Sequence, residues 1–153
     1  MIFDAHMHVG DFGPMFNVSL DQDRLAFTLP WSIEELAVAH PGVKVILGHM
    51  GHGNVVYINA SIDVAARNPN VYLETSGMPM HTKIKEAVER VGAERVLYGS
   101  DVSFHHPAVE ILRVQVSGLD PERPEQVLRT NARALFPGEA APVEEATTGR
   151  RAG

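Results

Sequence analysis

The stretch VKVILGH at residues 43–49 decides the expected fold. It is rich in β-branched side chains and almost continuously apolar, which is typical of a strand buried on both faces of a parallel sheet. A helix is predicted directly before it, in SIEELAVAHPG at residues 32–42, where Ser32 can act as the N-cap and Glu35 completes a capping box. Pro41 and Gly42 end that helix. A helix followed by a buried strand is the repeating unit of an α/β protein.

The same alternation continues on both sides of this stretch. Residues 2–7 are predicted to form a first strand, and residues 10–30 a loop with at most one short helical turn at 21–27. Further strands are predicted at 70–77 (NVYLETSG) and 94–101 (ERVLYGSD), and further helices at 54–67, 82–92, 107–117 and 121–135. This pattern predicts a parallel sheet of about four strands. Residues 137–153 have almost nothing to bury, so we expect a disordered tail.

Composition narrows the classes of protein that this chain can belong to. With 153 residues, 44% of them hydrophobic, the chain can bury a core in one domain. A formal net charge of −6 with scattered basic residues argues against nucleic acid or an anionic membrane surface as a partner. The absence of cysteine excludes thiolate metal sites. No stretch is apolar enough to span a bilayer, and no signal peptide is visible, so we expect a cytoplasmic protein.

Unusual polar residues follow the predicted strands, at the end where parallel sheets gather their functional groups. His6 and His8 end the first strand and point to the same face, where two imidazoles can bind a divalent metal. Asp101 ends the last strand, and on position alone the default interpretation is a cap for the next helix, but together with the two histidines it completes a His-His-Asp set. Such a set suits one catalytic zinc ion, and manganese or iron(II) would accept the same ligands.

His49 ends the strand at 43–49 and enters a glycine-rich turn. It can be a third metal ligand, a general acid or base that polarises a substrate, or a histidine bonded to nearby backbone. His52 is expected at the surface, and Asp4 is expected to hold a neighbouring side chain of the site by a hydrogen bond. His105 and His106 can reach the mouth of a pocket, but a solvated pair in a loop is the default interpretation.

Five motifs in order resemble landmarks of the amidohydrolase superfamily: FDAHMHVG, HPGVKVILGHMG, NPNVYLETSG, RVLYGSDVSF and NARALF. They are most similar to the branch that includes aminocarboxymuconate-semialdehyde decarboxylase. The resemblance implies a (β/α)₈ barrel with a divalent metal, His6 and His8 as its ligands, and Asp101 as a ligand that also accepts a proton from metal-bound water. By the same resemblance His49 binds or polarises the substrate, and Asn131 is structural.

The chain departs from this pattern because only the matches to strands one, six, seven and eight are visible. The histidine of strand five and the bridging lysine or glutamate of strand four are missing, so a binuclear centre is not expected. The resemblance therefore implies a partial TIM-type barrel over residues 1–136, with open sheet edges. Open edges are normally covered, so we expect a homodimer or another oligomer, in which His52, His105 or His106 could complete a partner's site.

Three functions remain open from the sequence. The first is a metal-dependent hydrolase, in which Asp101 takes a proton from metal-activated water, His49 stabilises the oxyanion, and hydroxide attacks a carbonyl or ester-like carbon of a small molecule. The second is a non-oxidative decarboxylase of the same family. The third is an inactive barrel remnant that serves as a binding or assembly module.

Overall fold

The structure is a computed structural model that describes residues 33–51 and 54–136. Several of the sequence-based predictions concern residues outside these ranges. They are the strand at 2–7, the loop at 10–30, the tail at 137–153, the N-cap Ser32, and the side chains of Asp4, His6, His8 and His52.

A three-stranded parallel sheet organises the described residues, in the order β1 (Val45–Leu47), β2 (Val71–Glu74) and β3 (Val96–Leu97). Leu47 lies opposite Leu73, and Leu73 lies opposite Val96. The α/β class and the neighbouring positions of these three strands are as the sequence predicts. The arrangement is a partial barrel, with one strand fewer among the described residues than the four expected.

The strands are shorter than predicted, most of all at 94–101. Residues Ala93–Arg95 form a short 3₁₀ helix, η3, so the strand begins only at Val96. It ends after Leu97, whose carbonyl accepts from the Thr75 N–H at 3.0 Å. The next N–H along the chain, that of Tyr98, donates to the carbonyl of Val127 at 3.0 Å.

Most of the predicted helices are present. Residues 33–39 are helical, and α2 (Val55–Arg67), α3 (Thr82–Val91) and α4 (Pro107–Gln115) follow. Their local signals are clear: the Asn54 side chain accepts from the Val56 N–H at 2.9 Å, and Pro107 occupies the first turn of α4. The helix predicted at 121–135 is a run of three segments, α5 (Arg123–Glu125), the π-helical η4 (Gln126–Thr130) and α6 (Asn131–Leu135).

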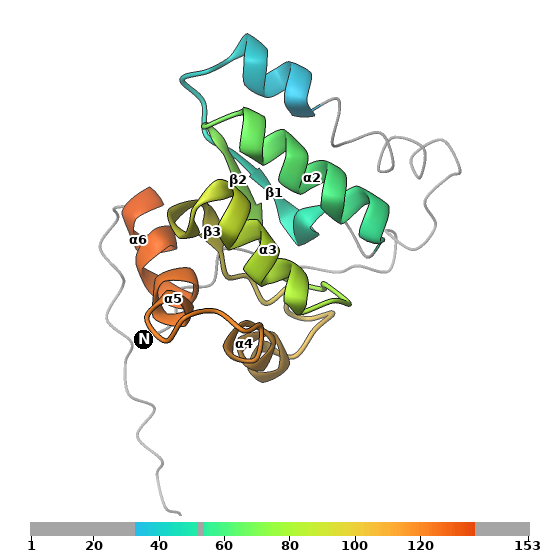
Figure 1. The fold of residues 1–153 in the computed structure, drawn as a ribbon, viewed down its shortest axis with the longest axis vertical. Helices are drawn as coiled ribbons and strands as arrows, with labels where there is room; N and C mark the ends of the chain where they lie inside the picture. Colours follow the sequence, from blue (N-terminus) through green and yellow to red (C-terminus); the bar gives the residue numbers. More distant parts are fainter. Residues whose placement is uncertain (1–32, 52–53, 137–153) are drawn as a thin grey trace, which may run out of the picture.

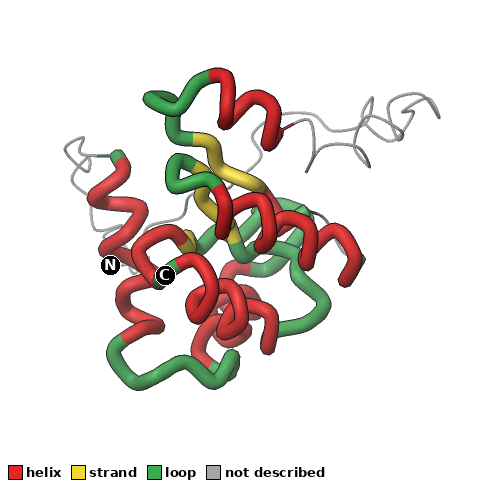
Figure 2. The backbone as a smooth tube through the Cα atoms, turned by 45° about the horizontal axis from the view of Figure 1, so that its top comes forward, coloured by secondary structure: helices red, strands yellow, loops and turns green. Residues whose placement is uncertain are grey.

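Helices α2 and α3 lie side by side across one face of the sheet (Figures 1 and 2). Their buried side chains form one core with the strands, including Ile62 of α2, Ile84 of α3 and Leu73 of β2. Since Leu73 faces these helices, the next pair in register, Glu74 and Leu97, points to the opposite face. Glu74 is fully buried there, so the sheet directs a carboxylate away from its helical layer.

None of the helices in the described part of the chain has the length and apolarity needed to cross a membrane.

Candidate functional site

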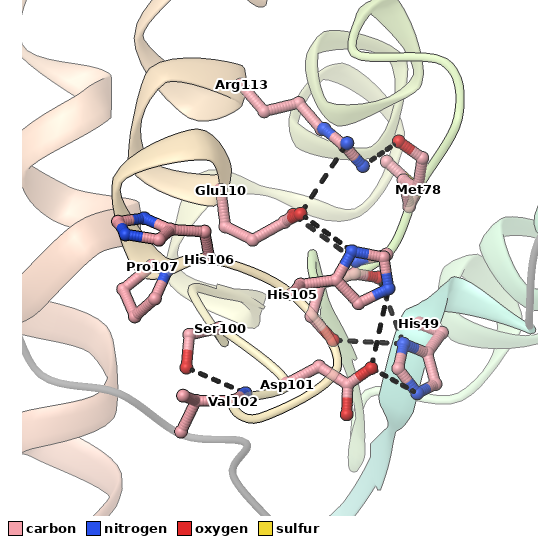
Figure 3. Close-up of polar contacts among 12 residues, drawn as sticks. His49, Met78, Ser100, Asp101, Val102, His105, His106, Pro107, Glu110 and Arg113 are labelled. Carbon is pink, nitrogen blue, oxygen red and sulfur yellow. Dashed lines mark hydrogen bonds and ion pairs between the residues drawn. The ribbon is translucent and has the colours of Figure 1, made fainter.

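The carboxyl ends of the strands bring together His49 and Asp101, with His105 from the loop after β3 (Figure 3). Ser76, from the loop after β2, lies beside His49. His49 lies in η2 (Gly48–Met50), which follows β1 directly. Its Nε2 is 3.8 Å from Asp101 Oδ2, and His105 Nε2 is 3.6 Å from the same oxygen. Two imidazoles therefore face one carboxylate oxygen.

The His49 side chain is fixed on its other side by the loop after β2. Its Nδ1 lies 3.1 Å from the Ser76 carbonyl oxygen and 3.0 Å from Ser76 Oγ. A carbonyl can only accept, so Nδ1 carries a hydrogen, and in the neutral ring Nε2 presents its lone pair. The expectation of a histidine bonded to nearby backbone is thus correct for one nitrogen, while the other nitrogen faces Asp101.

Glu74 is a component of the site that the sequence analysis missed. Its buried carboxylate accepts from the His49 N–H at 3.0 Å, from the Ser76 N–H at 2.5 Å and from the Ser76 hydroxyl at 2.8 Å. These hydrogen bonds offset the cost of burying the charge. The only signal in the sequence is a glutamate that ends a buried strand and is followed by Thr75 and Ser76.

Asp101 is 4% exposed and has a φ of 51°, in the left-handed region that non-glycine residues seldom adopt. Its carbonyl accepts from the N–H groups of Phe104 and His105, at 2.9 and 3.1 Å, in a tight turn that leads toward α4. The alternative that Asp101 caps this helix is wrong. The N-cap is His106, whose Nδ1 accepts from the Ala108 N–H at 3.2 Å.

His105 is not the solvated loop residue that the sequence suggested, because it bridges two carboxylates. Its side chain is 38% exposed, with Nε2 facing Asp101 and Nδ1 lying 3.3 Å from Oε1 of Glu110. Its neighbour His106 is exposed and caps α4. The two adjacent histidines therefore have different roles, and the sequence alone does not separate them.

Glu110, in the first turn of α4, is the second carboxylate that the sequence analysis missed. Its side chain is fully buried, with Oε1 3.5 Å from a guanidinium nitrogen of Arg113 and Oε2 accepting from the Gly77 N–H at 3.2 Å. Burial raises the pKa of this carboxyl above its ordinary value of 4.5, against the opposing effects of Arg113 and His105. Arg113 also donates to the carbonyl of Met78, which ties α4 to the loop after β2.

A glycine stands between the two imidazoles. Gly77 has a φ of +64°, and a Cβ placed on it would lie 3.0 Å from His49 Nδ1 and 3.3 Å from His105 Nε2. Any side chain there would have to displace a ring. Position 77 therefore lets the loop after β2 approach both histidines closely.

Of the three predicted metal ligands, the structure describes only Asp101. Asp101 is buried at the strand ends as expected, whereas His6 and His8 lie outside the described residues. Within residues 33–51 and 54–136, no three His, Asp or Glu side chains are grouped so that they could hold a metal by themselves. The donor set still suits a divalent cation in type, since a carboxylate and imidazole nitrogens converge, but a metal site would need further ligands.

Comparison with known proteins identifies the family of the chain. The amidohydrolase family model Amidohydro_2 matches residues 3–138. The chain belongs to this amidohydrolase family. A gamma-resorcylate decarboxylase from Rhizobium radiobacter is 27% identical over 155 residues, which cover 88% of this chain and 45% of that enzyme. The chain therefore spans less than half of the length of this curated relative.

Solved structures support the barrel architecture. A TIM-barrel protein from Bordetella bronchiseptica has a TM-score of 0.62 at 24% identity, covering 86% of this chain and 44% of that protein. A dihydroxybenzoic acid decarboxylase from Polaromonas sp. JS666 with manganese and 2-nitroresorcinol has a TM-score of 0.55 at 24% identity, covering 76% and 40%. An amidohydrolase from Burkholderia multivorans with zinc has a TM-score of 0.59 at 16% identity, covering 71% and 49%. At these identities the likeness concerns the fold.

Proposed function

We propose that this chain carries the site of a metal-dependent, non-oxidative decarboxylase for a small hydroxy-aromatic acid. The observation that supports it most is Asp101, a buried carboxylate at the strand ends that faces the imidazoles of His49 and His105. The relatives named for gamma-resorcylate decarboxylation favour this reaction over the hydrolysis that the sequence put first.

The reaction needs a group that delivers a proton to a ring carbon. As the bond between the ring and the carboxylate breaks, its electron pair stays on the ring, a proton is added at that carbon, and CO₂ leaves. Asp101 is suited to carry this proton, because it is buried and two imidazoles lie within 4 Å of its Oδ2. His49 is held by Ser76 and so keeps a fixed orientation toward the substrate.

One divalent ion would be held by His6, His8 and Asp101. Such an ion supplies positive charge that stabilises negative charge on substrate oxygens. Zinc was expected from the ligand types, and the manganese in the Polaromonas structure makes manganese an equal candidate here. We further propose that a second copy of the chain covers its open sheet edges, which light scattering tests directly.

The first experiment measures metal content by plasma mass spectrometry after dialysis. The wild-type chain is loaded separately with zinc and with manganese and compared with a His6→Ala/His8→Ala variant. A His40→Ala/His81→Ala variant is the matched control, because both of these histidines are exposed and lie outside the site. We expect about one ion per chain in the wild type and the control, and none in the His6/His8 variant.

The second experiment follows conversion of gamma-resorcylate to resorcinol by chromatography, with Asp101→Asn as the inactive variant. We expect turnover by the metal-loaded chain and a loss of at least about a hundredfold in the variant. Metal binding without turnover would reject the decarboxylase and leave a binding module. The absence of both would reject the enzyme altogether.

A further inference from the structure

We propose that His105, oriented by the buried Glu110, is a substrate-binding residue that accepts a hydrogen bond from a phenolic hydroxyl. This inference rests on the proposed function for the class of ligand. It assigns to Glu110 the part of a positioning residue, which acts through His105 and does not itself touch the ligand. Figure 3 shows the chain of groups involved, from Arg113 through Glu110 and His105 to Asp101.

The first step concerns which nitrogen of His105 carries the hydrogen. Nδ1 lies 3.3 Å from Glu110 Oε1, an oxygen that is buried and has no hydrogen bond among the described residues. A lone pair on Nδ1 would be repelled by this carboxylate, whereas an N–H there is attracted to it. Nε2 also faces a carboxylate oxygen, Oδ2 of Asp101, but at the longer distance of 3.6 Å, so its attraction for the hydrogen is weaker. Neutral His105 is therefore held with its hydrogen on Nδ1 and its lone pair on Nε2.

The second step is that His49 adopts the same tautomer for an independent reason. Its Nδ1 faces the Ser76 carbonyl at 3.1 Å, so its Nε2 also presents a lone pair. Both Nε2 atoms lie within 4 Å of Asp101 Oδ2. Three hydrogen-bond acceptors thus converge at the strand ends, and they favour a ligand that brings donors.

The third step is access. The side chains of His49 and His105 are 20% and 38% exposed, so a ligand can reach both, whereas the Glu110 side chain is fully buried. Gly77 lies between the two rings and offers no side chain that would block them. A hydroxy-aromatic acid carries hydroxyl donors beside its carboxylate, and the 2-nitroresorcinol bound in the Polaromonas decarboxylase keeps such hydroxyls without a carboxylate to lose.

The tautomer is tested by long-range ¹H–¹⁵N NMR of the histidine rings at a pH where they are neutral. We expect the wild-type His105 to show hydrogen on Nδ1, and a Glu110→Gln variant to shift it toward the Nε2–H form because the carboxylate charge is gone. His106→Asn, which keeps a capping side chain, should leave the His105 signals unchanged. A wild-type His105 with hydrogen on Nε2 would overturn the inference without any need of a variant.

The ligand is tested by calorimetry of the metal-loaded chain with 2-nitroresorcinol. We expect His105→Phe, which keeps an aromatic ring but loses the acceptor, to weaken binding about tenfold, and His106→Asn to change it less than twofold. Equal affinity in wild type and His105→Phe, or no binding by the wild type, would overturn the assignment. Intact, His105-dependent binding without turnover of gamma-resorcylate would sustain this inference and reject the proposed reaction alone.

Discussion

The two ends of the sheet differ in how well their polar groups are hydrogen-bonded. At the amino ends, side-chain N–H groups of Asn70, Arg95 and Asn131 donate to main-chain carbonyls and tie the strands to the preceding loops. At the carboxyl ends, carboxylates are buried, and the buried Thr75 Oγ1 and Glu110 Oε1 have no hydrogen bond among the described residues. The hydrogen bonds at the first end contribute stability, whereas the second end keeps buried polar atoms that lack a hydrogen bond within the described part of the chain.

Backbone conformation follows the same division. The non-glycine residues with positive φ in the described part of the chain are His49, Met50 and Asp101, and all of them follow the carboxyl ends of strands. Left-handed conformations cost energy in residues with a Cβ, and they persist only where the surrounding structure holds them. The comparison therefore separates a satisfied end from a strained end of one small sheet.

The largest expected effect comes from breaking the satisfied end at Arg95. Its guanidinium donates to the carbonyls of Ala65, Asn68, Val71 and Val91 at 2.6–3.4 Å. Replacing Arg95 with leucine leaves these carbonyls short of donors, so we expect a loss of about 3 kcal/mol in the free energy of unfolding. Urea denaturation measures this loss.

Arg129→Leu is the matched control for this change. Arg129 is on the surface and pairs with Glu125 at 3.1 Å, so its loss should cost less than about 1 kcal/mol. Equal losses for the two arginines would show that the carbonyl contacts at the amino end contribute nothing special.

The next effect is expected at the strained end, from Gly77→Ala. A Cβ at this position meets both imidazoles within 3.3 Å, and the φ of +64° disfavours it as well. We expect a loss of about 1–2 kcal/mol in unfolding free energy and weaker binding of 2-nitroresorcinol, because both rings must move. Denaturation and calorimetry measure the two effects separately.

Gly118→Ala isolates the contribution of the rings. Gly118 has a similar φ of +83°, but its added Cβ would meet only the flexible Lys85 side chain at 3.7 Å. It should lose stability without a change in ligand binding. If Gly77→Ala also loses stability without a change in ligand binding, the contact of position 77 with the two histidines does not matter for the ligand.

Most of the fold could be predicted because its signals are local. Ile84, Ala87 and Val91 recur at helical spacing and are all buried in α3, and the apolar run at residues 43–49 contains β1. His49 and Asp101 could be predicted to meet, since both follow strands of one parallel sheet. Local signals of this kind need no knowledge of what lies opposite in space.

The remainder depends on contacts between distant segments. Glu110 can be a buried carboxylate on a helix because it contacts His105, Arg113 and the Gly77 N–H. No spacing in the sequence predicts that arrangement. The partner of the first N–H after β3 is likewise distant in sequence, since Tyr98 donates to the carbonyl of Val127 in η4. His105 and His106 look alike in sequence and are separated only by what each ring faces.

The raised pKa of Glu110 predicts that removing its buried negative charge, at the carboxyl ends of the strands, stabilises the protein. Burial raises this pKa above 4.5, so the ionised carboxylate destabilises the folded state, and the penalty grows as the pH rises from 4.5 through the raised pKa. Glu110→Gln should therefore raise the unfolding free energy by about 1 kcal/mol at pH 7, with a gain that disappears toward pH 4. Thermal unfolding over this pH range measures the gain in stability. A variant less stable than wild type at pH 7 would contradict the conclusion that the ionised Glu110 destabilises the folded state.

The smallest effect should carry the opposite sign, at Glu34 near the amino ends. Hydrogen bonds from Arg67, at 2.8 Å, and from Asn68 hold the pKa of Glu34 below 4.5. Its ionised form therefore stabilises the fold above pH 4.5, and this contribution is lost as the pH falls through the lowered pKa. Because the pair is near the surface, Glu34→Gln should lower the melting temperature by only about 2 °C at pH 7, less at high salt, and not at all in acid. Glu35→Gln, one residue further along and exposed, is the control. Stability differences for Glu34→Gln and Glu110→Gln that diverge in opposite directions as the pH rises would establish the contrast between the two ends, whereas the same direction in both would remove it.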